Sequence, residues 1–126
     1  MRVSIRVEGS PVPKGRPRFT RYGGIMTPRR TADYEERVAE AWRTQQPDTV
    51  FHGMVEIFCY FGTKRHSVKD LDNLEKSVWD GLQKGGAFAV GDSQIYASHA
   101  SKYPPLDEEN VIVVIRDLEK YQYNNQ

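Results

Sequence analysis

The sequence predicts an α+β (mixed α/β) fold: a single small domain in which a mixed sheet of about four strands packs with two helices. Segments with the two-residue repeat of a strand occur near both ends and in the middle of the chain, and two other segments carry the helical repeat. No linker or internal repeat divides the chain. Its 126 residues are enough for one hydrophobic core, so we expect one domain over residues 1–126.

The composition is that of an ordinary globular protein, with 38% hydrophobic and 28% charged residues. No apolar run approaches the length of a membrane span, and no apolar signal segment follows Met1. The single cysteine, Cys59, rules out an intramolecular disulfide and lies in an apolar run, where a core residue is expected and not a nucleophile. We therefore expect a cytoplasmic protein with no membrane partner.

Regular alternation and apolar runs locate the strands. They are expected over residues 2–8, 54–61, 95–103 and 111–115. The second is expected to be central because few polar residues interrupt it, and the fourth to be buried on both faces because its β-branched run is unbroken. The polar tail after residue 118 is expected to fray.

The first helix is expected to begin at Thr31, which would act as N-cap, with acidic residues near the positive end of the helix dipole. Tyr34, Val38 and Trp42 form its apolar stripe, and Pro47 closes the region. The second helix carries a stripe from Leu74 to Leu82 and ends at two consecutive glycines, Gly85 and Gly86.

Basic charge is concentrated near the start of the chain. Residues 1–30 hold eight basic residues and one acidic residue, a net charge of +7, whereas the other 96 residues hold 10 basic and 16 acidic residues, a net charge of −6. Prolines and glycines predict an extended, exposed path over residues 9–18, and Phe19 and Tyr22 among the basic residues can stack on bases. A solvated basic loop is the alternative, but the absence of acidic residues from 14 to 30 favours a nucleic acid contact.

The eight residues 69–76 bring together the carboxylates of Asp70 and Asp72, the amide of Asn73 and the ammonium of Lys76. Residues two apart on a helix differ by about 200° of rotation, whereas in extended backbone they share a face. The side chains of Asp70 and Asp72 can therefore converge on one point only if residues 70–72 are extended. Lys76 follows Asp72 by one helical turn and precedes Asp80 by one turn, on the polar side of the second helix.

Two interpretations of this acidic pair are open. In the first, Asp72 is an N-cap with Glu75 as its capping-box partner, and Asp72 forms a solvated pair with Lys76. In the second, the pair binds a hard cation, because Mg²⁺ is usually held by one or two carboxylates together with water and phosphate. The basic loop at residues 62–69, directly before Asp70, favours metal-assisted chemistry on a phosphodiester. A turn at Gly91-Asp92 offers a further carboxylate.

The segments 69–76, 79–82 and 91–95 resemble the RusA family of Holliday-junction resolvases, and the resemblance extends over nearly the whole chain. Residues 13–18 with Thr27-Pro28 are similar to one branch of that family. Family members often carry an adjacent acidic pair where this chain has Gly91-Asp92, so Asp92 is the only matching carboxylate there. The resemblance implies a homodimer that requires Mg²⁺ and makes paired nicks in branched DNA, across a four-way junction.

The resemblance also assigns site residues. Asp70, Asp72 and Asp92 match the family's metal-binding aspartates and Lys76 its essential lysine, so these four are the expected catalytic residues, with Mg²⁺ as cofactor. Lys76 would stabilise developing charge or assist proton transfer, and the sequence leaves both roles open. The residues expected to hold the DNA backbone are Lys14, Arg16, Arg18, Arg21, Lys64, Arg65 and Lys69.

Two other functions are compatible with the same residues. One is a DNA-binding module without catalysis, in which Asp70 and Asp72 serve only as helix caps. The other is a metal-dependent nuclease that acts on other branched or flapped DNA. A calcium-binding structural protein fits less well, because the acidic residues lack the spacing of a calcium loop.

Overall fold

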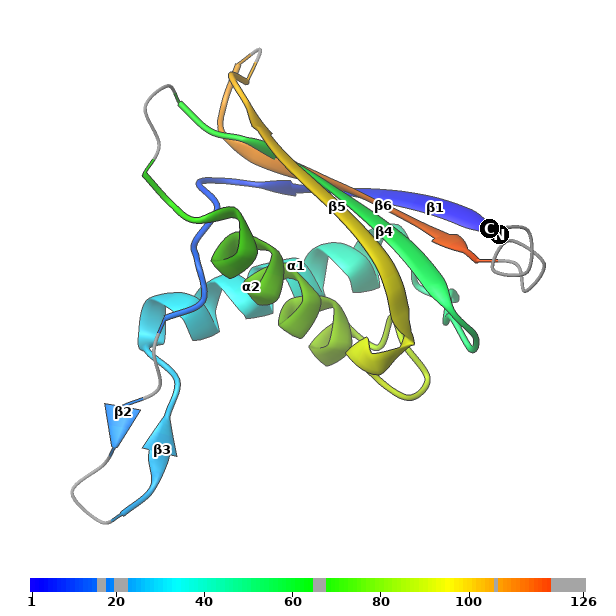
Figure 1. The fold of residues 1–126 in the computed structure, drawn as a ribbon, viewed down its shortest axis with the longest axis horizontal. Coiled ribbons are helices and arrows are strands. Elements are labelled where there is room, and N and C mark those ends of the chain that lie inside the picture. Colours follow the sequence, from blue (N-terminus) through cyan, green and yellow to red (C-terminus); the bar gives the residue numbers. More distant parts are fainter. Residues whose placement is uncertain (16–17, 20–22, 65–67, 106, 119–126) are drawn as a thin grey trace.

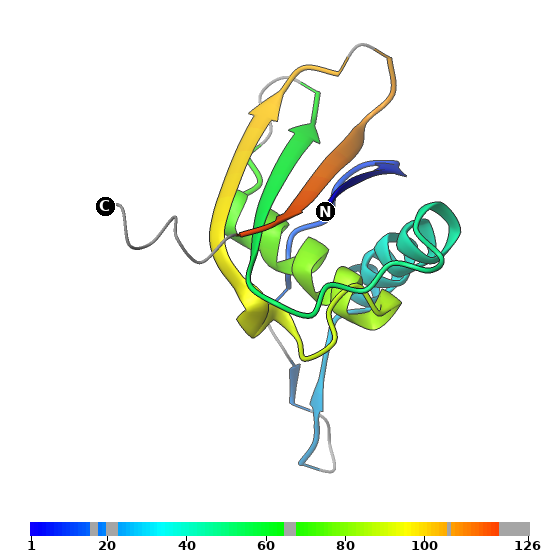
Figure 2. The same ribbon diagram turned by 90° about the vertical axis from the view of Figure 1, so that its right-hand side faces the viewer.

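The computed structural model describes residues 1–15, 18–19, 23–64, 68–105 and 107–118. Its body has two layers, a sheet and a pair of helices on one face of that sheet (Figures 1 and 2). The sheet strands are β1 (Arg2–Glu8), β4 (Val55–Gly62), β5 (Ile95–Tyr103) and β6 (Asn110–Asp117), and the helices are α1 (Arg29–Gln45) and α2 (Leu71–Gly85). The predicted α+β class, the four-stranded mixed sheet and the two helices are confirmed.

The strand order in the sheet is β1-β6-β4-β5. β6 runs antiparallel to both β1 and β4, whereas β4 and β5 are parallel neighbours. Parallel neighbours cannot be joined by a tight turn, because the chain must return to the starting end of the sheet before the second strand begins. Here α2 makes that crossover, so the acidic segment before and within its first turn lies between β4 and β5, after the basic residues that follow β4.

The hydrophobic core lies between the sheet and the helix pair. β4 turns Val55, Ile57, Cys59 and Phe61 toward the helices, and all four are fully buried. Cys59 is therefore a core residue, as expected, and its burial raises the pKa of its thiol. None of the described helices is long and apolar enough to cross a membrane.

The expectation that residues 111–115 are buried on both faces is wrong. Val111, Val113 and Ile115 are buried against the helices, but Ile112 and Val114 are only half-buried on the opposite face. The helices cover one face of the sheet, so an unbroken β-branched run marks a central strand here without a second covering layer (Figure 2).

The expected start of the first helix is also wrong. α1 begins at Arg29 after Pro28, without a side-chain cap and without an acidic residue in its first turn. Thr31 lies inside the helix and is buried, and its Oγ1 accepts a hydrogen bond from the Gly15 N–H at 3.0 Å and donates one to the Pro13 carbonyl at 3.3 Å. The hydroxyl that suggested a cap therefore holds the N-terminal segment against α1.

The end of the second helix is as predicted. α2 ends at Gly85, and Gly86 takes the left-handed conformation, with φ 87°, that residues other than glycine adopt at a cost. The Ala87 N–H then donates to the Leu82 carbonyl at 3.0 Å, which satisfies a carbonyl of the last turn.

A short hairpin, β2 (Arg18–Phe19) with β3 (Ile25–Met26), projects from the body on the side away from the sheet (Figure 1). We name residues 10–26 the N-terminal arm. The sequence predicted an extended path here but no strands, because strands of two residues show no repeat. Among the described basic residues of the arm, Arg18 thus stands on this projection.

The two helices pack closely at Gly81. A Cβ added there would lie 2.5 Å from the Val38 Cβ and 2.8 Å from the Glu35 carbonyl oxygen. Gly81→Ala is expected to destabilise the fold, because overpacking, which costs about 1–3 kcal/mol, outweighs the gain in helix propensity of about 1 kcal/mol. Chemical denaturation would measure this difference. Gly53→Ala is the control, since a Cβ at Gly53 meets no atom within 4 Å, and equal stability of the two variants would contradict the tight contact.

Candidate active site

The acidic pair lies at the start of α2. Asp70 is the N-cap residue, with extended backbone at φ −74° and ψ 133°, and its side chain makes no capping hydrogen bond. Asp72 is already in the first turn, where its Oδ1 accepts a hydrogen bond from the Asn73 N–H at 2.9 Å. The expected extended backbone therefore holds for Asp70 and is wrong for Asp72. The capping box on Asp72 is wrong too, because the helix begins one residue before it.

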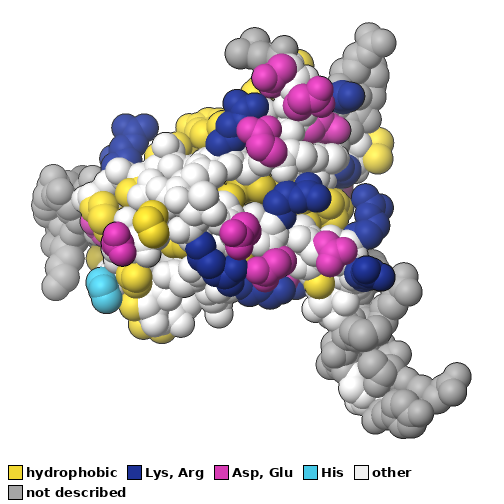
Figure 3. All heavy atoms as spheres, turned by 180° about the vertical axis from the view of Figure 1, so that it is seen from behind, with side chains coloured by type: hydrophobic (Ala, Val, Ile, Leu, Met, Phe, Trp, Pro, Cys, Tyr) yellow, Lys and Arg dark blue, Asp and Glu magenta, His cyan; other side chains and the backbone are white. Residues whose placement is uncertain are grey.

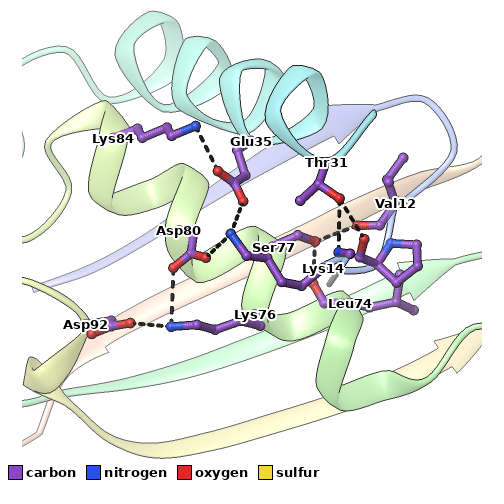
Figure 4. Close-up of polar contacts among 12 residues, drawn as sticks. Val12, Lys14, Thr31, Glu35, Leu74, Lys76, Ser77, Asp80, Lys84 and Asp92 are labelled. Atoms are coloured by element: carbon purple, nitrogen blue, oxygen red, sulfur yellow. Dashed lines mark hydrogen bonds and ion pairs between the residues drawn. The ribbon is translucent and has the colours of Figure 1, made fainter. Parts of the chain in front are cut away.

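Lys76 and Asp92 come together although 16 residues separate them. The Lys76 Nζ is 2.9 Å from Asp92 Oδ2 and 3.3 Å from Asp80 Oδ1 (Figure 4). The hydrogen bond to Asp92 raises the pKa of Lys76, burial opposes this more weakly, and Asp80 adds to the rise. Lys76 is therefore an ammonium held between two carboxylates.

Asp92 is positioned by a short 3₁₀ helix, η1 (Asp92–Gln94), at the turn expected from Gly91-Asp92. The buried Gln94 side chain donates to the carbonyls of Phe51 and Gly53, both at 2.9 Å, and accepts from the Val90 N–H at 2.7 Å. Gly91 has φ 153°, a conformation that favours glycine. The Asp92 carboxylate is thus carried by a segment that the Gln94 hydrogen bonds hold in place beside the C-terminal half of α2.

The N-terminal arm begins alongside α2. Lys69 donates from Nζ to Ser10 Oγ at 3.0 Å and to the Pro11 carbonyl at 2.6 Å. Ser77 Oγ donates to the Val12 carbonyl at 2.6 Å (Figure 4). The Lys14 N–H donates to the Asn73 carbonyl at 2.8 Å. The two basic segments expected from the sequence therefore meet, and the arm starts next to the acidic motif.

The Lys14 side chain is enclosed by carboxylates. Its Nζ is 2.7 Å from Glu35 Oε2 and 2.9 Å from Asp80 Oδ2, and Glu35 also pairs with Lys84 at 2.7 Å (Figure 4). Burial acts to lower the pKa of Lys14, but the hydrogen bonds to Glu35 and Asp80 outweigh it and the pKa is raised. This geometry does not favour the phosphate contact expected of Lys14, which stays a prediction.

The other residues expected to bind DNA are distributed differently. Arg16, Arg21 and Arg65 lie outside the described residues, and Arg18 stands on β2. Lys64 is exposed near the end of β4, and Lys69 holds the arm as described above. Seen from behind, basic and acidic side chains are interspersed on the described surface and form no broad patch of one sign (Figure 3). The basic excess of the N-terminal sequence is thus partly neutralised in three dimensions.

The three aspartates expected to hold a metal divide into two places. Asp70 and Asp72 lie at the start of α2, whereas Asp92 lies beside its C-terminal half, where the Asp92 N–H donates to Gln83 Oε1 at 3.2 Å. Among the described residues, no three His, Cys, Asp or Glu side chains lie close enough to hold one metal ion together. The donor chemistry at the helix start still fits Mg²⁺, which needs few protein ligands, and Asp70 is not used as a side-chain cap.

Comparison with known proteins agrees with the motifs. The family model for the endodeoxyribonuclease RusA matches residues 8–116. The chain is 30% identical over 120 residues to a crossover junction endodeoxyribonuclease RusA of Aquifex aeolicus (strain VF5), with 93% of each chain covered. The chain belongs to the RusA family. This RusA-family protein is therefore an endodeoxyribonuclease, as the resemblance in the sequence predicted.

Sequence reasoning missed several residues around this RusA site. Glu35 was taken only as an acidic residue near a helix start, yet its side chain is just 3% exposed. The signal was available, because Thr31, Glu35 and Val38 follow the spacing of the buried stripe of α1. The contact of Asp80 with Lys14 and the role of Gln94 were not visible, since both depend on contacts between segments far apart in the sequence.

Glu75 lies on the side of α2 that faces β5, where the fold disfavours its negative charge. Its Oε2 is buried and has no hydrogen-bond partner among the residues that the structure describes. Burial raises the pKa of the Glu75 carboxyl and Asp72 acts in the same direction, whereas a hydrogen bond with Ser98 and the nearby His99 act against them. Because the pKa is higher in the folded state, ionised Glu75 lowers stability at pH values above its ordinary pKa.

Glu75→Gln is expected to raise the melting temperature near neutral pH, because it removes a charge that the fold disfavours. The advantage should vanish in acid, below the ordinary pKa of 4.5, where the carboxyl is protonated in both folded and unfolded chains. Melting curves across this pH range would measure the effect. Glu36→Gln is the control, since Glu36 is exposed and pairs with Arg43 at 2.9 Å. A lower melting temperature for Glu75→Gln near neutral pH would contradict the expectation.

Proposed function

We propose that this protein is a Holliday-junction resolvase, a Mg²⁺-dependent endonuclease that cuts four-way DNA junctions by paired nicks in recombination and repair. Membership of an endodeoxyribonuclease family supports the reaction class. One observation of this chain carries the proposal: the Lys76 ammonium lies 2.9 Å from the Asp92 carboxylate. Lys76 belongs to α2, the helix whose N-cap is Asp70 and whose first turn holds Asp72. An ammonium among carboxylates is an arrangement suited to phosphoryl chemistry.

We propose that Asp70, Asp72 and Asp92 are the residues that hold Mg²⁺. When bound, this ion would activate a water molecule and neutralise charge on the phosphoryl oxygens. Mg²⁺ usually keeps several waters and takes phosphate oxygens from the substrate, so the aspartates at the start of α2 need not form a complete cage. The positive end of the helix dipole at this point also favours an approaching phosphate.

Lys76 acts as a charge stabiliser in this proposal. The Lys76 Nζ lies 2.9 Å from Asp92 Oδ2, and a lysine side chain is ordinarily cationic at neutral pH. A fixed ammonium favours the transition state because charge develops on the phosphoryl group as the bond to the leaving oxygen breaks.

DNA is held by the basic residues of the arm and of the segment before α2. Backbone contacts of this kind fix the position of the DNA without reading its sequence. Hydrogen bonds from Lys69 to Ser10 and Pro11 support one continuous binding surface, because they join the two basic segments. The predicted contacts remain Lys14, Arg16, Arg18, Arg21, Lys64, Arg65 and Lys69, with Lys14 the least favoured by its geometry.

Paired nicks require two sites, so we propose that the protein acts as a homodimer in the cytoplasm. Phe58 and Tyr60 of β4 pair with Val114 and Ile112 of β6 on the face of the sheet away from the helices. Tyr60 is exposed and the others are half-buried, which makes this face the apolar surface that a second copy would cover.

The experiment that tests the function compares a synthetic four-way junction with a linear duplex of the same sequence. Mg²⁺-dependent, paired cleavage of the junction alone is expected. Asp70→Asn, Asp72→Asn and Asp92→Asn should each abolish cleavage and preserve junction binding, because Mg²⁺ requires charged oxygen ligands whereas binding depends on basic residues. Glu36→Gln is the control for loss of a surface carboxylate.

Each alternative predicts a different result. Binding without cleavage would indicate a DNA-binding module, and equal cleavage of flaps or other branched DNA would indicate a nuclease of another specificity. Near wild-type cleavage by one of the three aspartate variants would remove that residue from the site.

Lys76→Met should slow cleavage at saturating enzyme by about a hundredfold or more, equivalent to about 3 kcal/mol of transition-state stabilisation. Junction binding should survive, because one cation among many contributes little to affinity. Lys76→Arg should rescue only partly, since a planar guanidinium does not replace a compact ammonium. Single-turnover rates, measured beside junction binding and melting temperature, would show this. Normal rates in a folded Lys76→Met variant would make Lys76 an ordinary residue of the helix surface.

A further inference from the structure

We propose that Asp80 is a positioning residue that holds the Lys76 ammonium in the active site, and that Lys14 holds Asp80 in turn. The inference rests on the proposed catalytic role of Lys76 and adds two residues to it. Asp80 follows Lys76 by one turn of α2, and its side chain is 21% exposed. Its two oxygens are divided between two lysines: Oδ1 lies 3.3 Å from Lys76 and Oδ2 lies 2.9 Å from Lys14 (Figure 4).

Both the backbone N–H and the side-chain ammonium of Lys14 are held by other residues, so the ammonium has a defined position beside Asp80. Its backbone N–H donates to the Asn73 carbonyl at 2.8 Å, and its ammonium is 2.7 Å from Glu35 Oε2. Glu35 is itself fixed, because its buried carboxylate also binds Lys84. The Lys14 side chain is 23% exposed, so leaving this place for a DNA phosphate would cost the two carboxylates their shared cation.

Lys76 needs such support because its side chain is long and 46% exposed. A flexible lysine side chain with a single hydrogen-bond acceptor moves whenever that acceptor moves. Holding such a side chain in one position costs conformational entropy. Here the ammonium has two acceptors, Asp92 on η1 and Asp80 on its own helix. Asp80 therefore retains the ammonium in the site when Asp92 engages another partner.

The charges of this network balance. Lys14, Lys76 and Lys84 supply three ammonium groups, and Glu35, Asp80 and Asp92 supply three carboxylates. The contacts run without a break from α1 through the arm and α2 to η1 (Figure 4). In Asp80→Asn, only one of the two side-chain oxygens remains. Lys14 or Lys76 must therefore lose its hydrogen bond to residue 80.

The first test is the isosteric variant Asp80→Asn. Single-turnover cleavage of a four-way junction at saturating enzyme should fall by about tenfold to a hundredfold, as expected when a catalytic group is misplaced. Junction binding measured with a chelator present should stay unchanged. Asp80→Glu, which keeps the charge, should recover part of the rate, whereas Glu36→Gln should cleave at the wild-type rate. Wild-type cleavage by a folded Asp80→Asn variant would overturn the proposal.

The second test is a double-mutant cycle between Asp80 and Lys76. If Asp80 acts through Lys76, Asp80→Asn should slow the wild type but cause no further loss in the Lys76→Met background. Equal slowing in both backgrounds would overturn the proposal, because Asp80 would then act elsewhere. Wild-type cleavage by Lys76→Met would instead remove the catalytic role of Lys76, and the inference would fall with it. The two failures are thus distinguishable.

Lys14→Met tests the same contact from the other side, so the proposal can be tested even if Asp80→Asn does not fold. Cleavage at saturating enzyme should slow, and the salt dependence of junction binding should match the wild type. Arg18→Met is the comparison, because loss of a phosphate contact from the same arm should lower the log–log salt slope by about 0.9. A lowered slope in Lys14→Met with normal saturated cleavage would make Lys14 a phosphate contact and overturn its assignment.

Discussion

The parallel pairing of β4 with β5 is the constraint on which the arrangement of the site depends. A parallel pair requires a crossover, and α2 is that crossover. Its first turn lies where the chain leaves β4, which is the position of Asp70 and Asp72, and η1 lies where the chain enters β5, which is the position of Asp92. Lys76 lies on α2 between the start of the helix and η1, and its side chain reaches Asp92 on η1. The same sheet pairing thus places Asp70, Asp72 and Lys76 on or at the start of α2, and Asp92 on η1 beside that helix.

Much of this could be predicted from the sequence, because it depends on repeats along the chain. The strands of the sheet, the apolar stripes and the glycine end of α2 follow from local spacing, and so does the neighbouring position of Lys76 and Asp80 on one helix face. The family motif added Asp92, which spacing alone could not connect to Lys76. What was missed or mistaken depends on tertiary contacts: Thr31 was read as a cap because its hydroxyl partner, the arm, is not visible in the sequence.

The net charge of the N-terminal sequence suggested more cationic side chains available to DNA than the structure shows. The N-terminal 30 residues have a net charge of +7, but Lys14 is matched by Glu35 and Asp80, and Lys69 is bonded to the arm itself. Two of the seven residues expected to contact phosphate are therefore used to hold the arm against α2 or to join the basic segments. A binding surface built this way depends on how the arm is anchored as well as on how many cations it carries.

The anchor itself depends on the close approach of α1 and α2. At Gly81, α2 has no side chain of its own, so the Val38 side chain and the Glu35 carbonyl oxygen of α1 can lie close to its backbone. The near contact brings the buried Glu35 carboxylate of α1 within reach of Lys84 on α2, while the arm supplies Lys14 from the other side. A buried carboxylate is costly unless it is paired, so α1, α2 and the arm must be assembled together for Glu35 to be satisfied. An apolar contact would bury a similar area without fixing the register, whereas shared carboxylates fix the arm and Asp80 at defined positions. The polar cluster between the helices therefore links the packing of the core to the position of Lys76.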